Sequence, residues 1–234
     1  MISSVFDDFI APPCHGEIRI LYQDADILLI DKPSGLLSLS GKNQLNKDSV
    51  HFRLEQGRLQ GDLSGQAFSS AILIHRLDFG TSGIMVVALN KRATSLISKQ
   101  FQARTVSKSY IAILEGQLSE DQGIIDFPIA KDKPNFPLQK ICYETGKLSR
   151  SEYRVVERLQ DPARCRVQFS PQTGRTHQLR IHSFKAGHPI LGCDLYKSEC
   201  SEQMAERLLL HATELQFDHP STGERIYGQS PCPF

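Results

Sequence analysis

The chain has 234 residues, 40% of them hydrophobic, and a formal net charge of +1. This size and composition allow one large domain with a buried core, and no apolar run approaches the ~20 residues that span a bilayer. The N-terminal residues include acids where a signal peptide needs basic residues, so we expect a cytoplasmic protein with no membrane partner. The six cysteines show no CxxC pair and no regular spacing, which favours reduced thiols over a zinc site or a disulfide framework.

The small net charge hides two stretches that contain no Asp or Glu. Residues 79–114 contain the basic residues Lys91, Arg92, Lys99, Arg104 and Lys108. Residues 162–193 contain the basic residues Arg164, Arg166, Arg175, Arg180 and Lys185. Such stretches indicate a polyanionic partner such as nucleic acid. Charge alone favours equally the alternative that two solvated faces of the protein happen to be basic.

The sequence predicts an arm, one domain and one long loop. We expect residues 1–16 to form an irregular N-terminal arm, because Pro12 and Pro13 interrupt it, and residues 17–234 to form a single domain. Residues 56–70 are polar and rich in Gly and Ser, which predicts a mobile surface loop.

Strands are predicted wherever short apolar runs rich in β-branched residues are bounded by turn residues. In chain order these runs are Ile18–Tyr22, Ile27–Ile30, Ala71–Ile74, Ile84–Leu89, Ser109–Leu114, Ser151–Glu157, Cys165–Phe169 and Leu208–Leu215. We expect Ala71–Ile74 and Ile84–Leu89 to be buried.

Two segments predict helices. Asn90 can cap a helix that extends to about Arg104, because apolar residues recur at helical spacing at Ala93, Leu96, Ile97 and Phe101. A second helix is predicted over residues 176–186, with Gly187 as the left-handed cap. Since strands outnumber helices, we expect an α+β fold with a mixed, largely antiparallel sheet and flanking helices.

The segment His75–Gly83, HRLDFGTSG, places Arg76 and Asp78 between the two runs that we expect to be buried. The pair is either a structural ion pair or a catalytic carboxylate held on a rigid strand end. An arginine is the natural partner for a catalytic carboxylate, because it stays charged and lowers the carboxyl pKa by about 1–3 units.

Three further segments contain residues suited to nucleic acid chemistry. Residues 172–182 offer two arginines and two histidines near a helix start, which suits a phosphate. His177 and His182 match no metal-binding pattern, so we expect no metal there. Tyr110 in Lys108–Ser109–Tyr110 is either a core residue or a stacking platform for an extruded base. For Lys32–Leu37, KPSGLL, we favour a tight turn.

From about Ile18 to Pro220, these segments resemble the RluA-type pseudouridine synthase family. The matching motifs are HRLDFGTSG (His75–Gly83), KPSGLL (Lys32–Leu37), KSY (Lys108–Tyr110), TGRTHQLRIH (Thr173–His182), HPILG (His188–Gly192) and LLLHA (Leu208–Ala212). The resemblance implies the pseudouridine synthase catalytic fold with a central RNA-binding cleft. It also implies an isomerase that converts specific uridines of structured RNA to pseudouridine, with no cofactor and no metal.

The resemblance also implies roles for single residues. Asp78 corresponds to the essential aspartate, Tyr110 to the tyrosine that stacks on the target uracil, and Arg180 to the arginine that pairs with the aspartate. Arg76 corresponds to the arginine that enters the RNA and helps to expel the target base. We expect RNA contacts from Arg76, His75, Lys91, Arg92, Lys99, Arg175 and His177.

The run 139–147, QKICYETGK, resembles a dual-specificity member of the family. This implies 23S ribosomal RNA and the anticodon stem-loop of transfer RNA as partners, and we expect a monomer with no obligate protein partner. Two alternatives stay open: an RNA-binding module without catalysis, and a hydrolase that uses Asp78 with Asp126 or Asp194. Whether Asp78 acts as a covalent nucleophile or as a base on the ribose also stays open.

Overall fold

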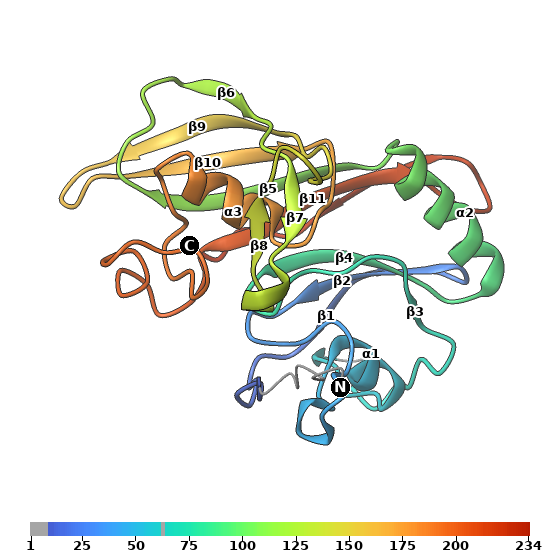
Figure 1. The fold of residues 1–234 in the computed structure, drawn as a ribbon. Coiled ribbons are helices and arrows are strands. Elements are labelled where there is room, and N and C mark those ends of the chain that lie inside the picture. Colours follow the sequence, from blue (N-terminus) through green and yellow to red (C-terminus); the bar gives the residue numbers. More distant parts are fainter. Residues whose placement is uncertain (1–8, 62–63) are drawn as a thin grey trace, which may run out of the picture.

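A computed structural model describes residues 9–61 and 64–234 of the chain (Figure 1). The strands are β1 (Arg19–Gln23), β2 (Ile27–Lys32), β3 (Ile72–Leu73), β4 (Ser82–Ala88), β5 (Ser107–Glu115), β6 (Gln122–Ile125), β7 (Ile129–Lys131), β8 (Gln139–Ile141), β9 (Ser151–Leu159), β10 (Arg164–Pro171), β11 (Leu210–Asp218) and β12 (Arg225–Gln229). The helices are α1 (Val50–Glu55), α2 (Lys91–Ala103) and α3 (Gln178–Lys185), with short 3-10 turns at Gln44–Asn46 and Lys133–Asn135. None of these helices is both long and apolar enough to cross a bilayer.

Most strands belong to one ten-stranded sheet in the order β1-β2-β4-β11-β5-β10-β9-β6, with β12 paired to β11 and β3 paired to β4. The pair β4–β11 is parallel, and the other pairs of this sheet are antiparallel. The α+β class and the mixed, largely antiparallel sheet are therefore confirmed.

The parallel pair brings two backbones very close together at Gly83. Gly83 has a φ of +116°, and a Cβ there would lie 2.2 Å from the carbonyl oxygen of Ala212. A side chain at this position would therefore force β4 and β11 apart.

Two hydrophobic clusters lie on the two sides of β11. One joins β1, β2 and β4 with α1 and α2, and the other joins β5 and β10 with α3. Figure 1 shows the corresponding halves of the molecule, with β11 running between them. Tyr110 of β5 packs against both clusters, so the boundary between the halves passes beside this side chain.

Helix α2 forms where local signals predicted it. The side chain of Asn90 accepts a hydrogen bond from the Ala93 N–H at 2.9 Å, and Ala93 and Ile97 are buried on one face. Helix α3 begins at Gln178, two residues later than predicted, because His177 has a left-handed φ of 56°. Gly187, at φ +86°, follows α3 in the left-handed conformation that the sequence predicted.

Two local predictions were wrong. The run 71–74 forms only the two-residue strand β3, and its Ile72 is exposed, because the chain leaves the sheet there to form the loop that contains Asp78. Asp78 therefore lies in an irregular loop before β4 and not at a strand end. The segment 56–70 is not simply a surface loop, because Leu59 and Phe68 are buried in the core beside α1; residues 62–63 lie outside the described residues.

The predicted arm also makes specific contacts. Residues 9–16 contain no helix or strand, and residues 1–8 lie outside the described part of the chain. The guanidinium of Arg53 donates hydrogen bonds to the carbonyl oxygens of Cys14 and Gly16, and the ring of Phe9 meets the ring of Phe79 edge-on at 5.4 Å. The arm is thus attached to the domain beside the loop that contains Asp78.

Candidate active site

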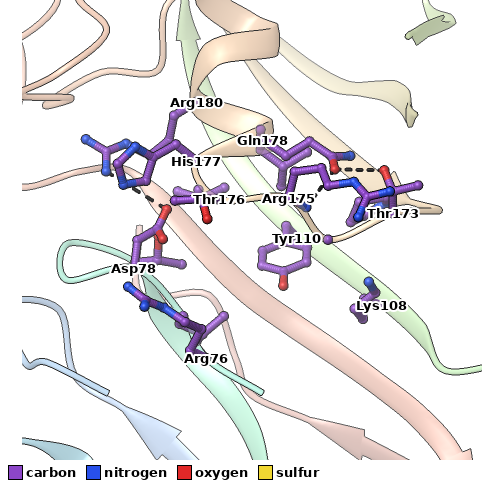
Figure 2. Close-up of a pocket in the computed structure, with 16 residues that line it drawn as sticks. Arg76, Asp78, Lys108, Tyr110, Thr173, Arg175, Thr176, His177, Gln178 and Arg180 are labelled. Atoms are coloured by element: carbon purple, nitrogen blue, oxygen red, sulfur yellow. Dashed lines mark hydrogen bonds and ion pairs between the residues drawn. The ribbon is translucent and has the colours of Figure 1, made fainter. Parts of the chain in front are cut away.

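One pocket collects side chains from four separate parts of the chain (Figure 2). The loop before β4 supplies Arg76, Asp78 and two neighbours, strand β5 supplies Lys108 and Tyr110, strand β11 supplies Leu210, and the segment from the end of β10 into α3 supplies the rest. The members from this last segment that Figure 2 labels are Thr173, Arg175, Thr176, His177, Gln178 and Arg180. The fold therefore joins four of the sequence motifs at the boundary between its two halves.

Asp78 and Arg180 face each other across the pocket. Arg180 Nη1 lies 3.9 Å from Asp78 Oδ2, and the two side chains are 5% and 18% exposed, respectively. At this distance the guanidinium stabilises a negative charge on Asp78 without occupying both carboxylate oxygens. One oxygen of Asp78 is thus available to a bound substrate.

Tyr110 also lines the pocket, and Figure 2 draws it between the labelled Asp78 and Lys108. Burial, with a smaller contribution from the Asp78 charge, raises the pKa of Tyr110 above its ordinary value. The phenol is therefore protonated near neutral pH, so it can donate a hydrogen bond while its ring supports a flat base.

Lys108 is a pocket residue that the sequence marked only as part of a basic stretch and of the KSY motif, with no role of its own in the site. It precedes Tyr110 by two positions in β5, so both side chains point to the same face of the strand. Burial and the nearby charge of Arg104 lower the pKa of Lys108. Because side chains alternate between the two faces of a strand, the position of Lys108 two residues before Tyr110 was the signal that could have placed it in the pocket.

The loop into α3 is held by the side chain of Gln178. Its Oε1 accepts hydrogen bonds from Thr173 Oγ1 at 2.7 Å and from the Arg175 N–H at 3.0 Å. Its Nε2 donates to the Arg150 carbonyl and to Ser151 Oγ at the start of β9. This network fixes the backbone conformation of the segment that contains Arg175 and Arg180. The sequence marked Gln178 only as part of a motif, without this role.

His177 is held by the hydroxyl of Tyr196, which lies 3.0 Å from its Nδ1. Burial lowers the pKa of His177, so its imidazole is neutral near pH 7. Its predicted RNA contact would therefore be a hydrogen bond from a neutral ring and not an ion pair with phosphate.

The pocket is strongly cationic. Among the described residues that line it, Asp78 is the one carboxylate, against four cations: Arg76, Lys108, Arg175 and Arg180. Such a balance favours a ligand that brings several negative charges, as the sugar-phosphate backbone of a nucleic acid does.

Four of the predicted RNA contacts lie outside this pocket. Lys91, Arg92 and Lys99 are exposed on α2 and do not line it, so their role stays a prediction. His75 has a structural role: its Nε2 accepts a hydrogen bond from the Val86 N–H at 3.0 Å, and its ring stacks on another ring, that of Phe101. Its contact with RNA also stays a prediction.

Lys32, in the motif that predicted a tight turn, has a second role that the sequence did not reveal. It is fully buried, and its Nζ donates to the carbonyl oxygens of Pro33, Leu36 and Phe79 at 2.9, 2.7 and 3.2 Å. Because Phe79 directly follows Asp78, this ammonium ties the loop of Asp78 to the turn after β2.

One group of side chains in the described residues has the spacing of metal ligands: Asp24, Asp26 and His219. It does not contribute to the pocket. Its members already form hydrogen bonds with one another and with neighbouring residues, since His219 Nε2 lies 2.9 Å from Asp24 Oδ2 and Ser221 Oγ donates to Asp26 Oδ2. We therefore interpret the group as a hydrogen-bonded connection between two turns.

Comparison with known proteins identifies the family of this chain. Residues 26–184 match the family described as RNA pseudouridylate synthase. The dual-specificity RNA pseudouridine synthase RluA of Yersinia pestis is 46% identical over 92% of this chain and 99% of its own length. The RluA of Escherichia coli strain K12 is 44% identical over 95% of this chain and 97% of its own length. This chain belongs to the RNA pseudouridylate synthase family.

The fold agrees with this assignment. The solved structure of human RNA pseudouridylate synthase domain containing 1 covers 95% of this chain with a TM-score of 0.73 and 28% identity, and the match spans 86% of that structure. The chain is therefore an isomerase that converts uridine in RNA to pseudouridine. Both alternatives from the sequence, an RNA-binding module without catalysis and a hydrolase, are wrong.

Proposed function

We propose that this synthase acts in the cytoplasm on uridines of 23S ribosomal RNA and of the anticodon stem-loop of transfer RNA. The support for this range of substrates is the similarity to relatives named as dual-specificity enzymes, which extends over nearly the whole chain. The motif at 139–147 gives the same indication from the sequence. We also propose that the enzyme works as a monomer in which residues 17–234 form one catalytic domain.

The chemistry requires the target base to leave the RNA helix. The bond between uracil N1 and ribose C1′ breaks, uracil turns, and a bond forms between C5 and C1′; the C5 proton is lost and N1 gains one. A stacked base cannot turn, so it must be flipped into the pocket at a cost of a few kcal/mol. We propose that Arg76 fills the gap left in the RNA and that Arg175 holds a neighbouring phosphate.

Inside the pocket we assign the chemical step to Asp78. Its carboxylate would attack the sugar as a nucleophile or remove a proton from the ribose, while Arg180 stabilises its charge. Tyr110 would hold the detached uracil by stacking so that it rotates and does not diffuse away. The observation that carries this proposal is one carboxylate opposite a buried guanidinium beside an aromatic ring, with the cations of the pocket around them.

Mapping of pseudouridine in cells with and without this gene tests the proposed substrates. We expect loss of the modification at one position of 23S ribosomal RNA and in the anticodon stem-loop of some transfer RNAs. Both should return when the gene is restored on a plasmid. Loss from only one of the two RNA classes would contradict dual specificity, and loss from neither would contradict the proposed substrates altogether.

A further inference from the structure

The guanidinium of Arg180 contacts other groups in addition to the carboxylate of Asp78. Its Nη2 pairs directly with Asp194 Oδ1, and its Nε donates to Cys193 Sγ at 3.4 Å. Its Cζ also lies 5.6 Å from the centre of the Tyr196 ring. The contact with Asp194 is much shorter than the 3.9 Å that separates Nη1 from Asp78.

We propose that Asp194 is a positioning residue that holds Arg180 at a working distance from Asp78. This inference rests on the proposed role of Asp78 as the reacting carboxylate. Asp194 lies in the segment after α3, and none of the resemblances that identified Asp78 and Arg180 gave it a part in this reaction.

The physical reason lies in how a guanidinium and a carboxylate attract each other. Without a second acid, a guanidinium as buried as that of Arg180 would be drawn into a bidentate pair with Asp78, which binds both carboxylate oxygens. Such a pair would leave Asp78 less able to attack or to take a proton. Asp194 compensates part of the positive charge and fixes one edge of the guanidinium, so that the other edge faces Asp78 without closing on it.

Two other roles for Asp194 fit the geometry less well. It does not line the pocket, so it is not placed as a second reacting carboxylate. A direct contact with RNA is also disfavoured, because a carboxylate repels phosphate. Its side chain is 63% exposed, so its replacement should leave the fold intact and affect mainly Arg180.

The test uses release of tritium from RNA that contains uridine labelled at C5, since the C5 hydrogen is lost when the new bond forms. For Asp194→Asn in the full-length enzyme, we expect kcat to fall about tenfold, the effect of losing one charge-assisted contact in the transition state. The Kd for RNA should stay unchanged. Asp194→Glu, which retains the charge, should recover most of the rate.

A matched control and a second background separate positioning from general damage. Asp121→Asn removes an acid that pairs with Arg158 at 2.7 Å on the surface, with a side chain 85% exposed, and should leave kcat unchanged. In an enzyme that already contains Arg180→Ala, Asp194→Asn should cause no further loss, because the residue acts through Arg180.

The outcomes distinguish this inference from the proposed function. If the unaltered enzyme releases tritium and Asp194→Asn has the same kcat, the positioning role is wrong while the function stands. The positioning role would also be wrong if Asp194→Asn lowered kcat by the same factor in the Arg180→Ala enzyme as in the enzyme that retains Arg180. If the unaltered enzyme bound the proposed RNAs without releasing tritium, the proposed substrates would be wrong, whatever the effect of Asp194→Asn.

Discussion

The replacement Lys32→Met tests whether a buried ammonium organises the reacting loop. Lys32 is inaccessible to solvent, and its Nζ donates to three carbonyl groups, one of them that of Phe79 next to Asp78. Methionine is one atom shorter than lysine, keeps most of its volume and donates no hydrogen bond. The replacement therefore removes the donors and leaves the apolar packing nearly unchanged.

The expected size follows from two opposing effects. Three buried carbonyl groups lose their donor, at about 1–2 kcal/mol each, and the cost of burying a charge disappears, which returns part of that loss. This burial cost is substantial, since burial lowers the pKa of Lys32 to about 7. We therefore expect the free energy of unfolding to fall by about 2–4 kcal/mol. The rate of pseudouridine formation should also fall, because the loop of Asp78 is released.

Urea denaturation measures the first effect and tritium release the second. Lys42→Met, at an exposed lysine, is the control and should change the free energy of unfolding by no more than about 0.5 kcal/mol. A Lys32→Met enzyme as stable and as active as the unaltered protein would refute the reasoning. Loss of stability with full activity would show that Lys32 supports the fold but does not position Asp78.

Two further measurements examine the predicted RNA surface and the partly buried His75. Neutralising Lys91, Arg92 and Lys99 together should flatten the salt dependence of RNA binding by up to ~2 log-log units, since each phosphate contact contributes roughly 0.7–0.9; an unchanged slope would place this face of α2 away from the RNA. Burial, with a smaller contribution from Lys108, lowers the pKa of His75 to about 3, so between that value and about pH 6.5 the unfolded chain binds a proton that the folded protein does not. The free energy of unfolding should therefore fall as the pH falls below about 6.5, by up to about 1.4 kcal/mol per pH unit from this residue. His75→Gln should show a shallower dependence, and equal slopes would contradict a neutral His75 in the folded state.

The elements that the sequence predicted well depend on local signals. Helix α2 follows from the Asn90 cap and from an apolar stripe whose members lie three or four residues apart. Strand β4 follows from an uninterrupted apolar run, and the structure buries every residue of this strand. The run at 71–74 looked equally apolar, but it becomes mostly loop because the chain must leave the sheet to bring Asp78 to the pocket. That requirement comes from the tertiary structure and has no local signature.

The residues of the site also divide into those that local sequence predicts and those that depend on the tertiary structure. Asp78, Tyr110 and Arg180 lie in recognisable motifs, and the structure brings these motifs into one pocket. The burial of Lys32 and the contact of Asp194 with Arg180 could not be predicted, because each joins segments whose approach depends on the whole fold. The motif that contains Lys32 does not show that its side chain is buried, and an aspartate after a cysteine has no pattern that separates it from a surface residue.

The most direct test of the account is the behaviour of Asp78→Asn in a paired binding and tritium-release experiment. Asparagine keeps the size of the side chain and removes its negative charge, so the pocket remains cationic and RNA binding should persist. Because the reacting carboxylate is gone, we expect no tritium release from RNA labelled at uridine C5. Release at the rate of the unaltered enzyme would contradict the role of Asp78 and with it the mechanism proposed for this pocket.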